Sequence, residues 1–141
     1  MPFPAGPGLE ELAVHGASRG LIGCSMTRDH LSCHFSGAET RVQQWIREGD
    51  LSREDIAREI WDLLARTMIR MLCAGAVKTG LDKALISGGV ASSVLLRRMM
   101  EERKQKTRGC PALYFGKPEM SGDGAVGVAL IGAAQYRLQT T

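Results

Sequence analysis

The sequence predicts an α/β protein made of one domain. Apolar residues recur at helical spacing over residues 52–80 and again over 91–106. Short apolar runs at 83–87 and 112–115 have the length of buried strands. Because these strands alternate with helices, we expect at least one parallel strand pair. The chain has 141 residues, of which 44% are hydrophobic and 23% charged, values that are typical of a single globular domain.

The N-terminal part predicts a loop, short helices and a strand pair. Residues 1–8 are rich in Pro and Gly and predict a loop. A short amphipathic helix should follow, with Leu9, Leu12 and Ala13 on one face. Residues 20–26 and 31–36 predict two strands joined by a polar turn. Residues 38–47 then carry apolar side chains at helical spacing.

The clearest helix begins after Ser52. Ser52 and Asp55 resemble a capping box, in which the hydroxyl and the carboxylate accept from the first free amides. Gly80 is expected to end the helix as a left-handed cap. The buried stripe contains Ile56, Ile60, Leu63, Leu64, Met68, Met71, Leu72 and Ala76.

The C-terminal half switches to shorter elements. A strand at 83–87 is followed by a glycine turn and a helix at 91–106. A second strand at 112–115 leads through a loop to a helix at 123–136. Internal repeats and a linker are both absent from the sequence, so one domain over residues 1–141 is expected.

Several classes of protein are disfavoured. The longest apolar run is shorter than the roughly 18 residues of a membrane helix, and Met1 begins no signal-peptide pattern. We therefore expect a cytoplasmic protein without membrane contact. A net charge of +3 does not by itself indicate nucleic-acid binding. The cysteines lack zinc-site spacing and are expected to be free, buried thiols: Cys24, Cys33, Cys73 and Cys110.

The segment from Ser87 to Ser93 is the strongest local candidate for a ligand site. A strand end, the glycines Gly88 and Gly89, and a helix start follow one another. Glycine lets a ligand approach the backbone, and a helix start offers free amides to a phosphate. A simple tight turn between strand and helix explains the pattern equally well.

Asp123 lies in a stretch that matches the dinucleotide-binding glycine pattern, Gly122 to Gly127. We reject that interpretation, because too few residues follow for the remainder of a βαβ unit. Asp123 is either the cap of the following helix or a ligand.

Two further patterns have ordinary explanations. His30 and His34 have the spacing of a helical metal site, but on a strand they would lie roughly 13 Å apart. Residues 97–108 are basic and could touch RNA phosphates, although a solvated helix end is the favoured interpretation.

Four segments, in order, resemble the glycoprotease family, named for O-sialoglycoprotein endopeptidase, whose universal members are tRNA adenosine threonylcarbamoyltransferases. Residues 3–13 are similar to a stretch that begins YPGGP in the family, and residues 34–40 to FSFSGLKT. Residues 87–93 are similar to AGGVAAN, which an LR pair follows, here within 95–97. Residues 114–132 are similar to FYPPPELCTDNAAMIAAAG.

The resemblance implies an actin/Hsp70-like ATPase fold, in which two RNase-H-like lobes close over a nucleotide. Residues 1–141 would form the C-terminal lobe, a mixed sheet with flanking helices. The family's paired metal histidines belong to the N-terminal lobe, which we expect to be absent from this chain.

The resemblance also implies roles for individual residues, none of them catalytic. Gly6 would line the pocket of the nucleotide's ribose or adenylate. Gly88 and Gly89 would approach the phosphates, and Ser93 stands where the family has an asparagine that contacts the nucleotide. Asp123 would complete the metal site. The implied cofactors are ATP or threonylcarbamoyl-adenylate and a divalent metal, iron, zinc or magnesium, all of which need the other lobe.

The implied function is part of a metal- and nucleotide-dependent transferase that makes threonylcarbamoyl-adenosine in tRNA, with this chain inactive alone. The implied partners are the N-terminal lobe, tRNA, and a paralogous subunit or a second copy. Glu39, Ser93 and Gly124 replace a lysine and two asparagines of the family. These departures leave open an alternative, a divergent non-catalytic paralogue that serves as a dimerisation or scaffold partner in the tRNA-modification complex. The family's older name, a metallopeptidase, has no local support in the residues.

Overall fold

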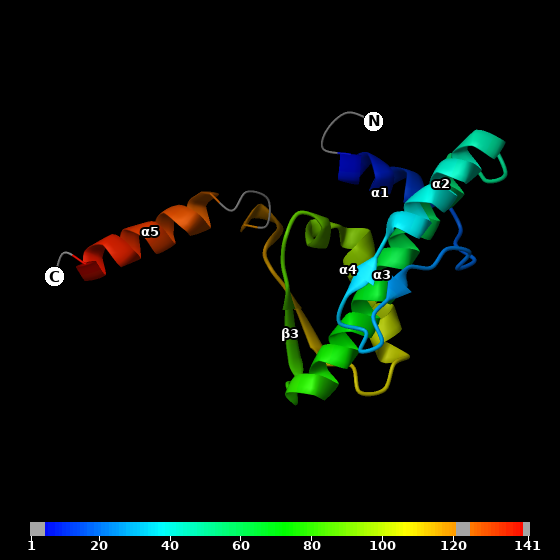
Figure 1. Cartoon of the computed structure of the whole chain (residues 1–141). Coiled ribbons are helices and arrows are strands. Elements are labelled where there is room, and N and C mark those ends of the chain that lie inside the picture. Colours follow the sequence, from blue (N-terminus) through cyan, green and yellow to red (C-terminus); the bar gives the residue numbers. More distant parts are fainter. Residues whose placement is uncertain (1–4, 121–124, 140–141) are drawn as a thin grey trace.

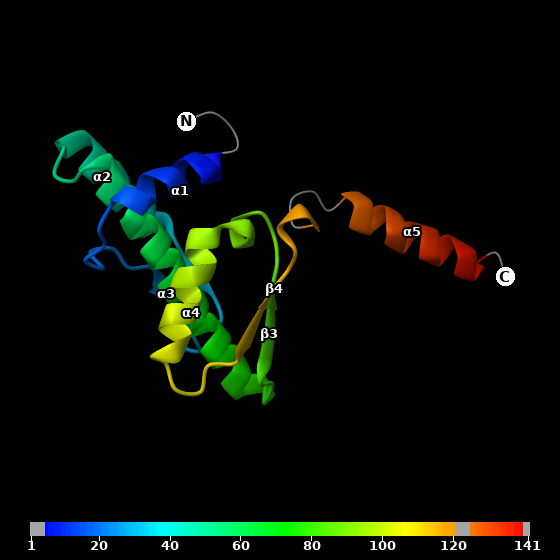
Figure 2. The same cartoon turned by 180° about the vertical axis from the view of Figure 1, so that it is seen from behind.

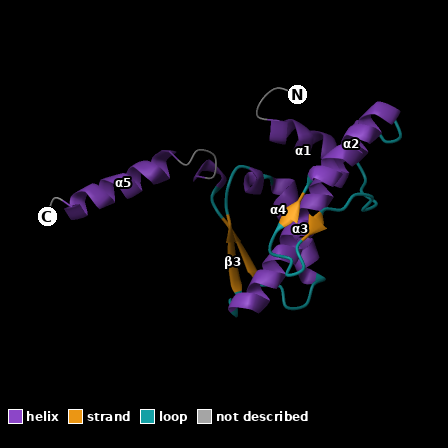
Figure 3. Ribbon diagram, viewed as in Figure 1, coloured by secondary structure: helices purple, strands orange, loops and turns teal. Residues whose placement is uncertain are grey.

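The structure is a computed structural model that describes residues 5–120 and 125–139. Its centre is the long helix α3, Arg53–Thr79, against which α1, Ala5–His15, and α4, Val94–Gln105, are packed (Figure 1). Helix α2, Ser36–Glu48, lies near the start of α3. The view from behind shows α4 in front of α3, with strands β3 and β4 beside them (Figure 2). Helices therefore dominate the body, and the strands are short (Figure 3).

Helix α3 begins and ends where its sequence predicts. The Ser52 hydroxyl accepts from the Asp55 N–H at 3.1 Å, and Gly80 has φ 73°. The Gly80 N–H donates to the Ala76 carbonyl at 2.8 Å. The second half of the predicted capping box is wrong, because the Asp55 carboxylate accepts from the Ala17 N–H at 2.8 Å. That carboxylate joins the segment after α1 to α3.

The strands form two separate small sheets. Strands β1, Ser25–Met26, and β2, Cys33–His34, are antiparallel. Strands β3, Lys83–Ile86, and β4, Ala112–Phe115, are parallel. The α/β class and the parallel pair are confirmed, whereas a single mixed sheet is wrong for the described residues.

The first strand pair is shorter than predicted for a physical reason. The backbone N–H groups of Arg19 and Leu21 donate to the Glu59 carboxylate of α3, at 2.5 and 3.0 Å. The Ile22 carbonyl accepts from Arg66 at 2.6 Å. The backbone of this segment is thus bonded to side chains of α3 rather than to a neighbouring strand.

The core consists of two clusters on opposite faces of α3. The larger one joins α1, α3, α4 and the parallel strands and contains Ala57, Trp61, Leu96, Met100 and Leu113. The smaller one joins α2 and the segment before β1 to α3 and contains Ile22, Ala38, Trp45, Ile56 and Leu63.

The starts of α1 and α4 differ from the sequence prediction. Helix α1 begins at Ala5 rather than after residue 8, and Pro7 is accommodated because first-turn amides need no intrahelical partner. A 3₁₀ turn, η1, Val90–Ser92, precedes α4, which begins at Val94 rather than at residue 91. A second 3₁₀ turn, η2, is Pro118–Met120.

Helix α5, Ala125–Gln139, runs away from the rest of the molecule (Figures 1 and 2). Its side chains at Val128, Leu130 and Ile131 are exposed. Across the described residues, none of the helices combines the length and the apolar character that a membrane span requires.

Candidate functional site

The glycine turn lies at the carboxyl ends of β3 and β4. Gly88 follows β3 and has φ 115°, a backbone conformation that residues other than glycine rarely adopt. Gly89 has φ −56°, which any residue can adopt. A Cβ atom at either glycine would meet nothing within 4 Å. The backbone of the turn therefore borders open space, at the strand ends where ligands of open α/β sheets bind.

The amides of this turn divide into two groups. The Ser92 N–H donates to the Gly89 carbonyl, and the Ser93 N–H donates to the Val90 carbonyl, both at 3.2 Å. The N–H groups of Gly88 and Gly89 have no acceptor within the part of the chain that the structure describes. Within the described residues, no acceptor competes with an anionic ligand for these two donors.

Arg97 fixes the turn to the end of β4. Its Nε donates to the Ala91 carbonyl at 2.6 Å, and its terminal nitrogen donates to the Gly116 carbonyl at 2.7 Å. The guanidinium also lies over the Phe115 ring, 5.1 Å from the centroid. The sequence placed Arg97 in a basic stretch and missed this role, although the LR pair after the glycine motif was a signal.

Ser93 has a structural role at the start of α4. Its side chain is buried, and its hydroxyl accepts from the Leu96 N–H at 3.0 Å. The Glu10 carboxylate of α1 accepts from the Leu95 N–H at 2.7 Å. Two first-turn amides of α4 are thus bonded by the protein itself, and the predicted contact between Ser93 and a nucleotide stays a prediction.

Gly6 and Asp123 stand differently in the structure. Gly6 lies in the first turn of α1, four residues before Glu10, and is exposed with open space around it. Gly6 and Glu10 lie on the same helix, and the Glu10 carboxylate is bonded to the start of α4, which follows the glycine turn. Asp123 lies outside the described residues.

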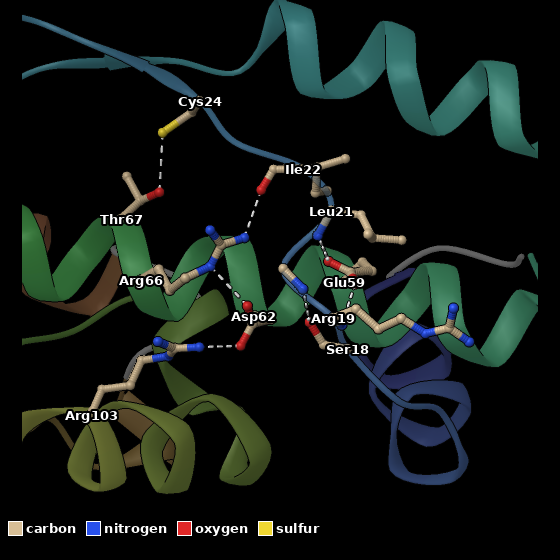
Figure 4. Close-up of polar contacts among 11 residues, drawn as sticks. Ser18, Arg19, Leu21, Ile22, Cys24, Glu59, Asp62, Arg66, Thr67 and Arg103 are labelled. Atoms are coloured by element: carbon tan, nitrogen blue, oxygen red, sulfur yellow. Dashed lines mark hydrogen bonds and ion pairs between the residues drawn. The ribbon is translucent and has the colours of Figure 1, made fainter. Parts of the chain in front are cut away.

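The sequence missed a buried polar network on α3. Glu59 is 1% exposed and holds the Arg19 and Leu21 amides, while the buried Asp62 pairs with both Arg66 and Arg103 (Figure 4). Every oxygen of these two carboxylates is engaged by a partner within the protein. We assign the network to stability and not to catalysis.

The cysteines are free, as predicted, and each is half-buried. Burial, and next the neighbouring Cys73 thiol, raises the pKa of Cys110 to about 12. Burial and Cys24 also raise the pKa of Cys33. Both thiols are therefore poor nucleophiles at neutral pH. Among the described residues, no cluster of three or more His, Cys, Asp or Glu side chains could hold a metal ion.

The family is decided by a comparison with protein-family models. The model of TsaD, tRNA N6-adenosine threonylcarbamoyltransferase, matches residues 1–122. The chain belongs to the TsaD family. The match includes the glycine turn, Arg97, Ser93 and Glu10, and it confirms the resemblance seen in the sequence motifs.

A solved structure shows the same fold in a much longer protein. The crystal structure of T. kodakarensis HypF is similar with a TM-score of 0.66 over 97% of this chain, at 20% sequence identity. The chain covers only 18% of that protein. At this identity the likeness bears on the fold alone.

Proposed function

We propose that the chain forms one wall of the nucleotide site of a tRNA threonylcarbamoyltransferase, as the C-terminal, RNase-H-like lobe of an actin/Hsp70-like fold. The observation that carries the proposal is the Gly88–Gly89 turn, which has unpartnered amides and open space and lies within the residues that match the TsaD family. The ligand would be ATP or threonylcarbamoyl-adenylate, and its ribose would lie near Gly6.

The chain's own residues would bind and orient the phosphate. The N–H groups of Gly88 and Gly89 would donate to phosphate oxygens, and Arg97 would keep the turn in place through the Ala91 and Gly116 carbonyls. In the transfer, the exocyclic amine of a tRNA adenosine attacks the carbamoyl carbonyl carbon. The bond from that carbon to the phosphate oxygen breaks, AMP leaves, and the amine loses a proton.

The described residues contain no cluster of side chains that could hold a metal ion. A divalent metal therefore fits this proposal only if other residues supply its ligands. The Asp123 carboxylate is an oxygen ligand of the kind that hard cations prefer. The family's N-terminal lobe would supply the histidine ligands. When bound, iron, zinc or magnesium would polarise the carbamoyl carbonyl. The partners of the whole protein would be tRNA and a further subunit or a second copy, in the cytoplasm.

One observation favours the non-catalytic alternative. Ser93 and Glu10 already bond the first amides of α4, so this helix start offers less to a nucleotide than an uncapped one. A paralogue that retains the fold to pack against partner subunits would show the same self-bonded helix. Activity of the full-length protein separates the two proposals.

The test measures threonylcarbamoyl-adenosine in a tRNA transcript by mass spectrometry, with threonylcarbamoyl-adenylate and the full-length protein. We expect Asp123→Asn to keep the fold, because asparagine caps helices about as well as aspartate, and to lose both bound metal and product. Equal metal content in the wild type and Asp123→Asn would contradict the ligand role of Asp123. Absence of product from the wild type would favour the non-catalytic alternative.

A further inference from the structure

A hollow of about 990 Å³ lies between the β1–β2 hairpin, the second half of α3 and the end of α4. The C-terminal end of α3 leads into the amino end of β3. The second half of α3, which lines the hollow, therefore leads to the amino ends of the parallel strands, whereas the glycine turn follows their carboxyl ends. The hollow shares no lining residue with the glycine turn and is separate from the proposed nucleotide site.

Four cationic residues line the hollow. They are Arg66, Arg70, Lys78 and Arg103, and Asp29 is the acidic residue of the lining. Arg66 and Arg103 share the buried Asp62, which holds both guanidinium groups in place and offsets part of their charge.

Arg70 supplies charge that no carboxylate of the described residues neutralises. It is exposed, and among the described residues no carboxylate pairs with it. Side chains such as Ile69 and Val77 form an apolar part of the same lining. An anionic ligand would thus meet fixed positive groups beside apolar surface.

The hairpin supplies a preformed wall. His30 has φ 56°, an uncommon conformation for a residue other than glycine, and its side chain lines the hollow. The Asp29 carboxylate holds the turn by accepting from the Thr27 hydroxyl at 2.6 Å and from the Leu31 N–H at 3.2 Å. The turn is therefore bonded in its observed shape without any ligand.

The positive charge continues past the hollow along the end of α4. Thr107 lines the hollow, and its neighbours Lys106 and Arg108 are exposed. These residues belong to the basic stretch 97–108, for which the sequence favoured a solvated helix end. The fold joins the end of this stretch to the cations of α3, so a surface forms that neither segment makes alone.

We propose that the hollow and the adjoining end of α4 bind the phosphate backbone of RNA. The exposed Arg70 and Lys78, with Lys106 and Arg108 beyond the hollow, suit a polyanion, and guanidinium groups match phosphate geometry. Because the surface is remote from the glycine turn, it would contact the tRNA away from the adenosine that is modified. The identity of this RNA as tRNA rests on the proposed function.

The test compares two charge reversals in the full chain. Arg70→Glu/Lys78→Glu alters the hollow without removing the Asp62 pairs. Arg47→Glu/Arg53→Glu changes the net charge equally on α2 and at the start of α3, which lie away from the hollow. Binding of an unmodified tRNA transcript is followed by fluorescence anisotropy from about 50 to 200 mM salt, a range over which phosphate contacts weaken strongly.

We expect the hollow variant to bind tRNA at least about tenfold more weakly than the wild type. The slope of log affinity against log salt concentration should fall by the equivalent of roughly one to two phosphate contacts. The tRNA affinity of the control variant should stay within about twofold of the wild type at the higher salt concentrations, where long-range attraction between charges is screened. Melting curves establish that both variants fold.

Two results would overturn the proposal. They are no tRNA binding by the wild type and equal losses of tRNA binding in both variants. The binding assay contains neither nucleotide nor metal, so its outcome is independent of the transfer reaction. A protein that binds tRNA through the hollow but forms no product would leave this inference standing and the proposed function wrong.

Discussion

At the scale of single residues, Glu59 shows how a buried carboxylate can shape the backbone. Both of its oxygens accept backbone N–H donors from the segment after α1. Glu59→Ala would leave these amides without acceptors, and we expect a loss of about 2–5 kcal/mol in the free energy of unfolding. Denaturant titration measures it.

Glu59→Gln is the matched control, because it retains one oxygen acceptor. We expect it to lose less than Glu59→Ala. Equal stability of the wild type and the alanine variant would show that these bonds contribute nothing net.

Cys110 gives a prediction about pH. Since its pKa is about 12 instead of the usual 9.0, the native thiol is protonated throughout the neutral range and ionises only as the pH approaches 12. The thiolate is the reactive form, so native Cys110 should react with iodoacetamide at least about tenfold more slowly than after unfolding at about pH 8. Peptide mass spectrometry follows the reaction. Equal rates in native and unfolded protein would refute the inert assignment.

The sequence could not reveal these residues by periodicity alone. The apolar stripe of α3 was visible because such residues recur at helical spacing, but Glu59 and Asp62 interrupt it as polar side chains. The partners of Glu59 lie about 40 residues away, on a segment without regular structure. Asp62 pairs with Arg66 on the same helix and with Arg103 on α4. Contacts of that kind come from the fold and leave no local pattern.

At the scale of elements, the approach of the segment after α1 to the start of α3 depends on Gly16. A Cβ atom at Gly16 would collide with the Glu54 carbonyl and lie 2.8 Å from the Asp55 N. Gly16→Ala should therefore destabilise the protein by about 1–3 kcal/mol, as overpacking does. Thermal unfolding monitored by circular dichroism measures the change.

Gly37→Ala is the control for Gly16. Gly37 lies in helix α2, and a Cβ atom there meets nothing within 4 Å. We expect no loss of stability, since alanine has the higher helix propensity. If the two variants melted alike, the backbones near Gly16 would not be tightly packed.

The ends of α3 were predictable from the sequence, and so was the strand pair β1–β2, but the short extent of these strands was not. Ser52 and Gly80 marked both ends of α3 because capping depends on local chemistry. Residues 20–24 have the composition of a strand, but their backbone groups bond to α3. The glycine turn was visible as a possible anion site, whereas the bonds that Arg97, Ser93 and Glu10 make around it required the fold.

At the scale of the whole molecule, apolar side chains are exposed on two separate elements. Leu85 and Tyr114 are paired in register on the outer face of the parallel strands, with exposed fractions of 73% and 52%. Helix α5 exposes further apolar side chains. Parallel sheets are usually covered on both faces, so we expect the chain to self-associate at high concentration. Sedimentation velocity tests this, and a strict monomer would contradict it.

The central claim is that the turn at Gly88 and Gly89 receives the phosphates of a nucleotide. The chain supplies one wall of the proposed cleft, so we expect ATP to bind in the millimolar range, as contacts to one wall leave much of a ligand solvated. A micromolar dissociation constant for this chain would contradict the one-wall account.

The most direct measurement is an NMR titration of the chain with ATP, comparing the wild type with Gly89→Ala and the control Gly75→Ala. Both glycines have open space for a Cβ atom, and neither has a left-handed φ, so both variants should fold. We predict amide shifts centred on residues 87–91 that disappear in Gly89→Ala and persist in Gly75→Ala. Shifts elsewhere in the protein, or shifts at the turn that survive Gly89→Ala, would contradict the account.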